Sequence, residues 1–204
     1  MAVYRYILES EHFDFDYDKW ETDPSVIKNV ESFADSLEKK YGAELDKLDE
    51  KIEKITEKCD NANTFEESTK YFDEYVNTLE ECVKYYEKTI SEISENVKKF
   101  KSQGIMDTET SDIIEANLKI YKAGIAVFEY QIQFCRDNKD LIFDDDSFEE
   151  SVTNKAEKAI KKFKAFIKKS SRTVKSAASK SRSMFKSIVS KFKSLANKLK
   201  KKIK

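Results

Sequence analysis

From residue 24 onward, apolar side chains recur every three or four positions along four long segments of the chain. This spacing places the apolar residues on one face of an α-helix, because a helix has about 3.6 residues per turn. The 204 residues include one proline and three glycines, so the residues that turns require are scarce. Periodicity and composition together predict a single all-α domain, an antiparallel bundle of long, coiled-coil-like helices.

The first expected helix covers residues 24–60. Asp23 can cap it, and Pro24 stands at the first helical position, where a missing N–H does no harm. Two consecutive steps of four around Gly42 indicate a stutter, which locally unwinds a coiled coil. The apolar seam of this helix consists of Val30, Phe33, Leu37, Tyr41, Leu45, Leu48, Ile52, Ile55 and Cys59.

The second and third helices are expected over 65–103 and 109–136. Thr64 and Glu67 match a capping box at the start of the second helix, and Gly104 is placed to end it. The third helix carries a core seam and a second apolar line, formed by Ile113, Ile120, Val127 and Phe134. We therefore expect the third helix to be the most buried of the three, with short links making neighbours antiparallel.

The first 22 residues have a different pattern, which predicts a short β-prone segment packed on the bundle. Residues 12–20, "HFDFDYDKW", alternate aromatic and acidic side chains, as a half-buried strand does. The aspartates invite a calcium interpretation, but an EF-hand loop starting at Asp14 would need Gly and Glu where Lys19 and Ser25 stand. We therefore expect no metal and no cofactor.

The charge of the chain is divided between its two parts. Residues 151–204 carry 19 Lys or Arg and one acidic residue, whereas residues 1–150 carry 19 basic and 38 acidic residues. This division predicts an acidic three-helix bundle over 23–147 followed by a basic interaction segment over 148–204.

The basic segment is strongly amphipathic. On a helical wheel its apolar residues fall within about 140° and stay in register from Phe148 to Ile203, which predicts one long helix or two helices in line. Residues 170–183 are a candidate hinge, because mainly small residues lie on their apolar side. The candidate apolar contact face consists of Phe163, Phe166, Ile167, Phe185, Ile188, Val189, Phe192, Leu195, Leu199 and Ile203. The opposite basic face consists of Lys186, Lys191, Lys193, Lys198, Lys200, Lys201 and Lys204.

A cationic amphipathic helix can lie in a lipid interface with its lysines toward anionic headgroups. The favoured function is therefore a non-enzymatic protein that binds or perturbs anionic membranes, by peripheral anchoring or in a toxin-like way. One alternative is a structural protein whose last helix packs on its own bundle, on partner helices or in a homo-oligomer. Another is non-specific nucleic-acid binding or packaging. The sequence leaves open whether lipid, the acidic body or another chain covers the apolar face.

Neither an enzyme nor a membrane-spanning protein is indicated. His12 is the only histidine, no glycine-rich phosphate loop is present, and no stretch approaches the roughly 20 apolar residues of a membrane span. Cys59, Cys82 and Cys135 are an odd number at wide spacing, which indicates reduced thiols. With no secretory signal visible, we expect a cytoplasmic or peripheral membrane location, and leaderless export or delivery into another cell stays open.

Overall fold

The computed structural model describes residues 24–143 and 152–202. Its elements are α2 (Pro24–Leu37), the π-helical turn η2 (Glu38–Gly42), α3 (Ala43–Asn61), α4 (Phe65–Ser102), α5 (Thr108–Phe143) and α6 (Val152–Lys202). The described ranges contain no β-strand, and the segment predicted to be β-prone, residues 1–22, lies outside them.

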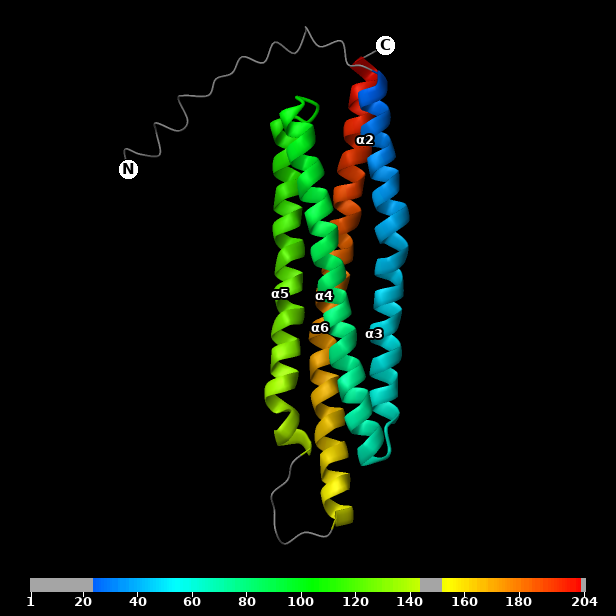
Figure 1. Ribbon diagram of the computed structural model, residues 1–204, viewed down its shortest axis with the longest axis vertical. Coiled ribbons are helices and arrows are strands. Elements are labelled where there is room, and N and C mark those ends of the chain that lie inside the picture. Colours follow the sequence, from blue (N-terminus) through cyan, green and yellow to red (C-terminus); the bar gives the residue numbers. More distant parts are fainter. Residues whose placement is uncertain (1–23, 144–151, 203–204) are drawn as a thin grey trace, which may run out of the picture.

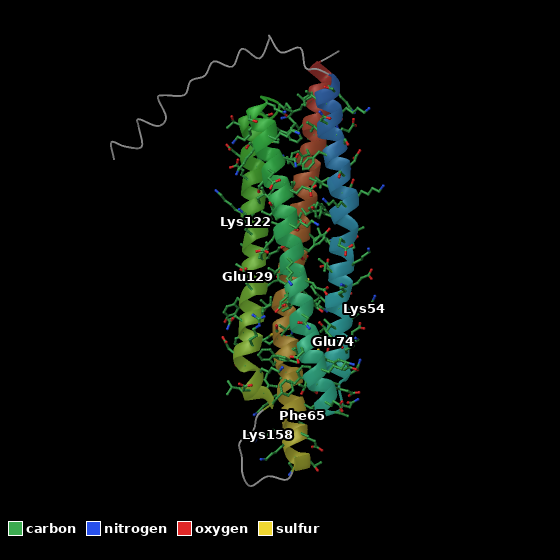
Figure 2. All side chains as sticks on the ribbon, in the orientation of Figure 1. Lys54, Phe65, Glu74, Lys122, Glu129 and Lys158 are labelled. Carbon is green, nitrogen blue, oxygen red and sulfur yellow. The ribbon has the colours of Figure 1, made fainter. Side chains whose placement is uncertain are left out.

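These helices form an antiparallel four-helix bundle (Figure 1). The elements α2, η2 and α3 follow one another as a single long rod, α4 and α5 return alongside it in turn, and α6 lies between α5 and that rod. This placement leaves α4 diagonally across the bundle from α6. The predicted all-helical bundle is confirmed, and charged side chains such as Lys54, Glu74, Lys122 and Glu129 surround it (Figure 2).

The helix ends follow the signals in the sequence. At the start of α4, the Glu67 amide donates to Thr64 Oγ1 at 3.1 Å, and the Thr64 amide donates to Glu67 Oε2 at 3.2 Å. Gly104 adopts a positive φ of 66° after α4, a conformation that glycine accepts without steric cost. The Ile105 amide then donates to the Phe100 carbonyl at 2.9 Å and closes the helix.

The rod contains one irregular turn, η2, at the place where the stutter was predicted. A π-helical turn holds one residue more than an α-helical turn, so it absorbs the extra step in the apolar spacing. Tyr41 lies within η2 and is 1% exposed. The apolar seam therefore continues from α2 into α3 without leaving the core.

Two features of α5 differ from expectation. The helix continues to Phe143 rather than ending near residue 136, because buried Ile142 and partly buried Phe143 return to the core after a polar turn. Burial of α5 is also incomplete: Ile120 is 49% exposed, and Phe134 is only half-buried. The apolar side of this helix is therefore wider than the face that α4 and α6 cover.

The long α6 helix runs unbroken through the candidate hinge at 170–183. Its 51 residues correspond to about 77 Å at the α-helical rise. Figure 1 shows its first turns extending past the end of α5 and its last turns lying beside α2, beyond the α4–α5 link. This stagger gives the C-terminal part of α6 a partner where α4 and α5 have ended.

Candidate functional site

The predicted apolar face of α6 lies in the bundle core. Phe163, Ile167, Ile188 and Phe192 are 0% exposed, and Phe185, Val189, Leu195 and Leu199 are at most 8% exposed. Phe166 is partly buried, and Ile203 lies outside the described residues. In this form the protein's own helices, rather than lipid or another chain, cover the face.

Aromatic clusters hold α6 near both of its ends. Toward the C-terminus, the Phe192 ring meets Phe33 of α2 and Phe100 of α4, with centroids 5.1 and 6.1 Å away. Toward the N-terminus, the Phe163 ring lies 5.9 Å from Phe143 and 6.4 Å from Phe72. Edge and tilted contacts of this kind stabilise a core beyond simple area burial.

The middle of α6 is held by small and polar residues instead. Tyr75 Oη lies 3.0 Å from Ser170 Oγ, and Ser170 Oγ donates to Gln131 Oε1 at 2.8 Å. Because Ser170 has a single proton, Tyr75 must donate in the first of these bonds. Ser170 therefore forms part of a hydrogen-bonded layer that links α4, α5 and α6.

One edge of α6 is neutralised by acids of the rod. Arg182 pairs with Asp46 and, at 3.2 Å, with Asp49 of α3. Farther along, the Lys193 ammonium lies 2.5 Å from a Glu38 oxygen of η2, and the Lys200 ammonium lies 2.5 Å from a Glu31 oxygen of α2. The acidic body therefore engages part of the predicted basic face directly.

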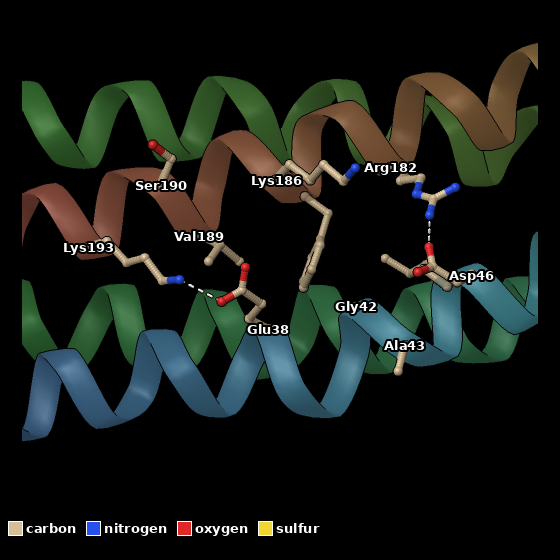
Figure 3. Close-up of a pocket in the computed structure, with 11 residues that line it drawn as sticks. Glu38, Gly42, Ala43, Asp46, Arg182, Lys186, Val189, Ser190 and Lys193 are labelled. Atoms are coloured by element: carbon tan, nitrogen blue, oxygen red, sulfur yellow. Dashed lines mark hydrogen bonds and ion pairs between the residues drawn. The ribbon is translucent and has the colours of Figure 1, made fainter.

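Two of these ion pairs border a pocket of about 440 Å³ between α6 and the rod (Figure 3). Gly42, Leu45, Phe185 and Val189 contribute to its apolar lining. The dashed lines in Figure 3 join Lys193 to Glu38 and Arg182 to Asp46 at the rim. With its charges paired across the opening, the pocket leaves no described cation free for an anionic ligand except Lys186.

The outward edge of α6 retains unpaired positive charge. Glu157 is the last acidic residue of the chain. The exposed side chains that make no ion pair with another described residue include Lys168, Lys169, Arg172, Lys175, Lys180 and Lys186. We call this set the cationic face.

Sequence reasoning located only part of the cationic face. Of the seven predicted basic positions, Lys193, Lys198 and Lys200 pair with acids, Lys186 and Lys201 are exposed, and Lys191 is half-buried. Lys204 lies outside the described residues. The predicted basic face begins at residue 186, although the same helical register places Lys168, Arg172 and Lys175 outside the apolar arc.

Other kinds of site receive no support from the described residues. Within 24–143 and 152–202, no group of three or more His, Cys, Asp or Glu side chains is arranged to hold a metal ion. Over the same ranges, no helix combines the length and the apolar character that crossing a membrane requires. His12 and the aspartates near it lie outside those ranges.

A scan against protein-family models and searches of curated proteins and of solved structures found no match to this chain.

Proposed function

We propose that the protein is a non-enzymatic membrane-surface protein, which binds anionic lipid as a folded bundle through the cationic face of α6. The observation that carries this proposal is the row of exposed, unpaired cations on one edge of a straight helix. From Lys168 to Lys186 this row extends about 27 Å, at the α-helical rise. A rigid row can bring several cations within a Debye length, about 8–10 Å, of a flat anionic surface at once.

The closed form of the bundle is the proposed binding form. Inserting the apolar face of α6 into lipid would first remove eight side chains from the core that are at most 8% exposed. Each such side chain contributes roughly 1.5–3 kcal/mol when buried, and a domain is stable by only about 5–15 kcal/mol. Lipid would have to replace all of these contacts together, whereas docking of the cationic face requires no opening.

Vesicle co-sedimentation tests the proposal. The variant Lys168→Gln, Arg172→Gln, Lys186→Gln removes three exposed charges from α6 without touching the core. Since each basic residue near an anionic surface contributes about 1 kcal/mol, the affinity for phosphatidylserine-containing vesicles should fall roughly 100-fold. Binding of the unaltered protein should weaken with added salt and be absent on phosphatidylcholine alone.

A matched control removes the same number of charges elsewhere. The variant Lys70→Gln, Lys84→Gln, Lys98→Gln alters exposed lysines of α4, diagonally across the bundle. This variant should bind anionic vesicles within about threefold of the unaltered protein. Equal losses in both variants, or salt-insensitive binding to neutral vesicles, would overturn the proposal.

A structural or assembly role is the second candidate, favoured by the burial of the α6 apolar face in the bundle core. In that role α6 simply completes the four-helix core, and the folded protein should bind neither type of vesicle. Binding to duplex DNA tests the third candidate function, nucleic-acid packaging. Salt-sensitive DNA binding without vesicle binding would favour nucleic-acid packaging.

A further inference from the structure

One flank of α5 carries apolar side chains that the bundle leaves exposed. Tyr130 is 64% exposed and Leu141 is 69% exposed, in line with Ile120 at 49%. Val127 and Phe134 lie half-buried between them. We call these five residues the α5 stripe, which extends about 32 Å along the helix. Exposed apolar side chains in a continuous row mark interaction surfaces more often than isolated ones do.

The α5 stripe borders a groove between α5 and α6. The groove has a volume of about 560 Å³ and is lined on the α5 side by Ile120, Ala123, Gly124 and Val127. Its α6 side is formed by Arg172, Thr173, Ser176, Ala177 and Lys180. Apolar residues therefore lie on one side of the groove and cations of the cationic face on the other.

Stacked aromatic rings support the lower part of the stripe. Tyr130 stacks on Phe134 with ring centroids 6.0 Å apart, and Phe134 stacks on Phe166 of α6 at 5.2 Å. Both pairs are nearly parallel, with interplanar angles of 10°. The stack fixes Tyr130, a residue type enriched at membrane–water interfaces, at the exposed end of a rigid row.

The charges beside the stripe decide among its potential occupants. Arg172 and Lys180 of the cationic face line the groove from the α6 side, opposite Ile120 and Val127 of α5. A second copy of the chain docked here would bring two rows of cations close together, which is unfavourable. An anionic bilayer instead offers headgroup charge to the cations and an acyl boundary to the apolar side chains at the same time.

We infer that the α5 stripe is the part of the protein that enters the lipid interface, while the cationic face of α6 contacts the headgroups. This inference rests on the proposed function and adds the depth and orientation of the bound molecule. The amphipathic surface is then formed by two neighbouring helices, with the apolar part on α5 and the charge on α6. The apolar face of α6 remains in the core.

Bromolipid quenching of tryptophan tests the inference. The substitution Trp20→Phe removes the native tryptophan, and Tyr130→Trp then places a single tryptophan on the stripe. The matched reporter variant, Asn77→Trp in the same background, places it at an exposed position of α4. With phosphatidylserine-containing vesicles brominated in their acyl chains, the fluorescence of the Tyr130→Trp variant should be quenched at least threefold more strongly than that of the Asn77→Trp variant.

The outcomes distinguish this inference from the proposed function. Vesicle binding with equal quenching in the two reporter variants would overturn the inference and leave the proposed function standing. A complete absence of vesicle binding would overturn both the inference and the proposed function.

A second variant, Ile120→Ser, Tyr130→Ser, Leu141→Ser, should lower vesicle affinity at least tenfold while its melting temperature stays within a few degrees, since the altered side chains are exposed. Undiminished vesicle affinity in this variant would contradict insertion of the stripe. Sedimentation velocity checks the competing occupant: a dimer that the serine variant abolishes would assign the stripe to a second copy of the chain and overturn the inference.

Discussion

At the level of single residues, α5 packs closely against α6 at Gly124. A Cβ built on Gly124 would lie 2.3 Å from Ser181 Oγ, while its other contacts would be ordinary, the nearest at 3.7 Å. Ser181 Oγ is buried and makes no hydrogen bond with another described residue. The close contact therefore involves a single hydroxyl group, which is buried without a hydrogen bond to another described residue.

Removing the Ser181 hydroxyl should reverse the destabilisation that an alanine at position 124 causes. We expect Gly124→Ala alone to destabilise the bundle by about 1–3 kcal/mol through overpacking. Ser181→Ala alone should be neutral or stabilising, because it removes an unsatisfied buried group. The double variant should be more stable than the unaltered protein by about 1 kcal/mol, given the helix propensity of alanine. Urea unfolding measures all three, and additive effects in the cycle would contradict the contact.

The buried hydroxyl of Ser170 should behave in the opposite way. Ser170→Ala leaves the Tyr75 hydroxyl and the Gln131 carbonyl without their shared partner, so we expect a loss of about 1–3 kcal/mol in the free energy of unfolding. Ser171→Ala is the matched control, because Ser171 Oγ bonds only to the Lys168 carbonyl of its own helix. Similar losses in the two variants, measured by urea unfolding, would argue against a structural role for the polar layer.

The helical wheel places Ser170 and Ser181 on the apolar side of the last helix, among the small residues of the candidate hinge. Nothing in the local pattern could identify their partners, because Tyr75 lies 95 positions away from Ser170. The three cysteines were easier to place, since each falls on an apolar seam and each is 0% exposed. Periodicity thus assigned which side a residue faces, but not what it meets there.

At the scale of elements, the π-helical turn η2 should tolerate the loss of one residue. Deleting Lys39 would change the apolar steps around Tyr41 from four and four to three and four, which is a regular heptad pattern. We expect the bundle to fold with a loss of no more than about 2 kcal/mol, while the turn becomes α-helical. Circular dichroism with urea unfolding measures the effect.

Deleting Lys54 provides the comparison. Lys54 is also an exposed lysine of the rod, but α3 is regular there, so its removal rotates one half of the seam by about 100° relative to the other. We expect this deletion to abolish cooperative unfolding. If the two deletions are equally damaging, the view of η2 as an inserted residue is wrong.

The helices of the bundle were predictable within one or two residues where capping signals exist, as at Thr64 and Gly104. The end of α5 was not, because the polar run from Arg136 to Asp140 interrupts the seam before Ile142 resumes it. The apolar spacing of the sequence also could not predict that the α5 stripe is exposed. Periodicity shows that a helix has an apolar side, but the number of neighbours it acquires depends on the whole assembly.

At the scale of the whole molecule, the buried thiols should make stability fall at alkaline pH. Burial raises the pKa of Cys59, Cys82 and Cys135 from 9.0 to about 12 in each case. Between these two values the unfolded chain releases protons that the folded chain keeps, so the free energy of unfolding decreases as pH rises above about 9. Urea midpoints from pH 7 to pH 11 should be level at first and then decline.

Replacing all three cysteines by alanine isolates the thiol contribution. The decline should then begin about one pH unit higher, where tyrosines of the unfolded chain begin to ionise. Burial raises the pKa of Tyr75, Tyr86 and Tyr121, so the later decline has the same sign. An unchanged onset in the alanine variant would show that the thiols do not contribute.

The division of charge and the amphipathic last helix were readable from the sequence, because both are properties of composition and spacing. What covers the apolar face of α6 was not readable, since lipid, the acidic body and another chain all satisfy the same pattern. In the described structure the body covers it, with Arg182, Lys193 and Lys200 paired to acids of the rod. We therefore propose that the membrane contacts the outward edge of α6 and the adjoining α5 stripe, and not the apolar face of α6.

Thiol labelling of the vesicle-bound protein shows directly whether the bundle stays closed when it docks on a membrane. Cys135 belongs to the same core as Phe163 and Ile167 of α6, lies within hydrogen-bond reach of the Ser170 hydroxyl and is 0% exposed. Protein bound to phosphatidylserine-containing vesicles at pH 8 should leave Cys59, Cys82 and Cys135 unmodified by iodoacetamide for as long as the free protein does, as measured by mass spectrometry. Rapid modification of Cys135 in the bound protein alone would show that α6 leaves the bundle on the membrane, and would contradict docking of the closed bundle.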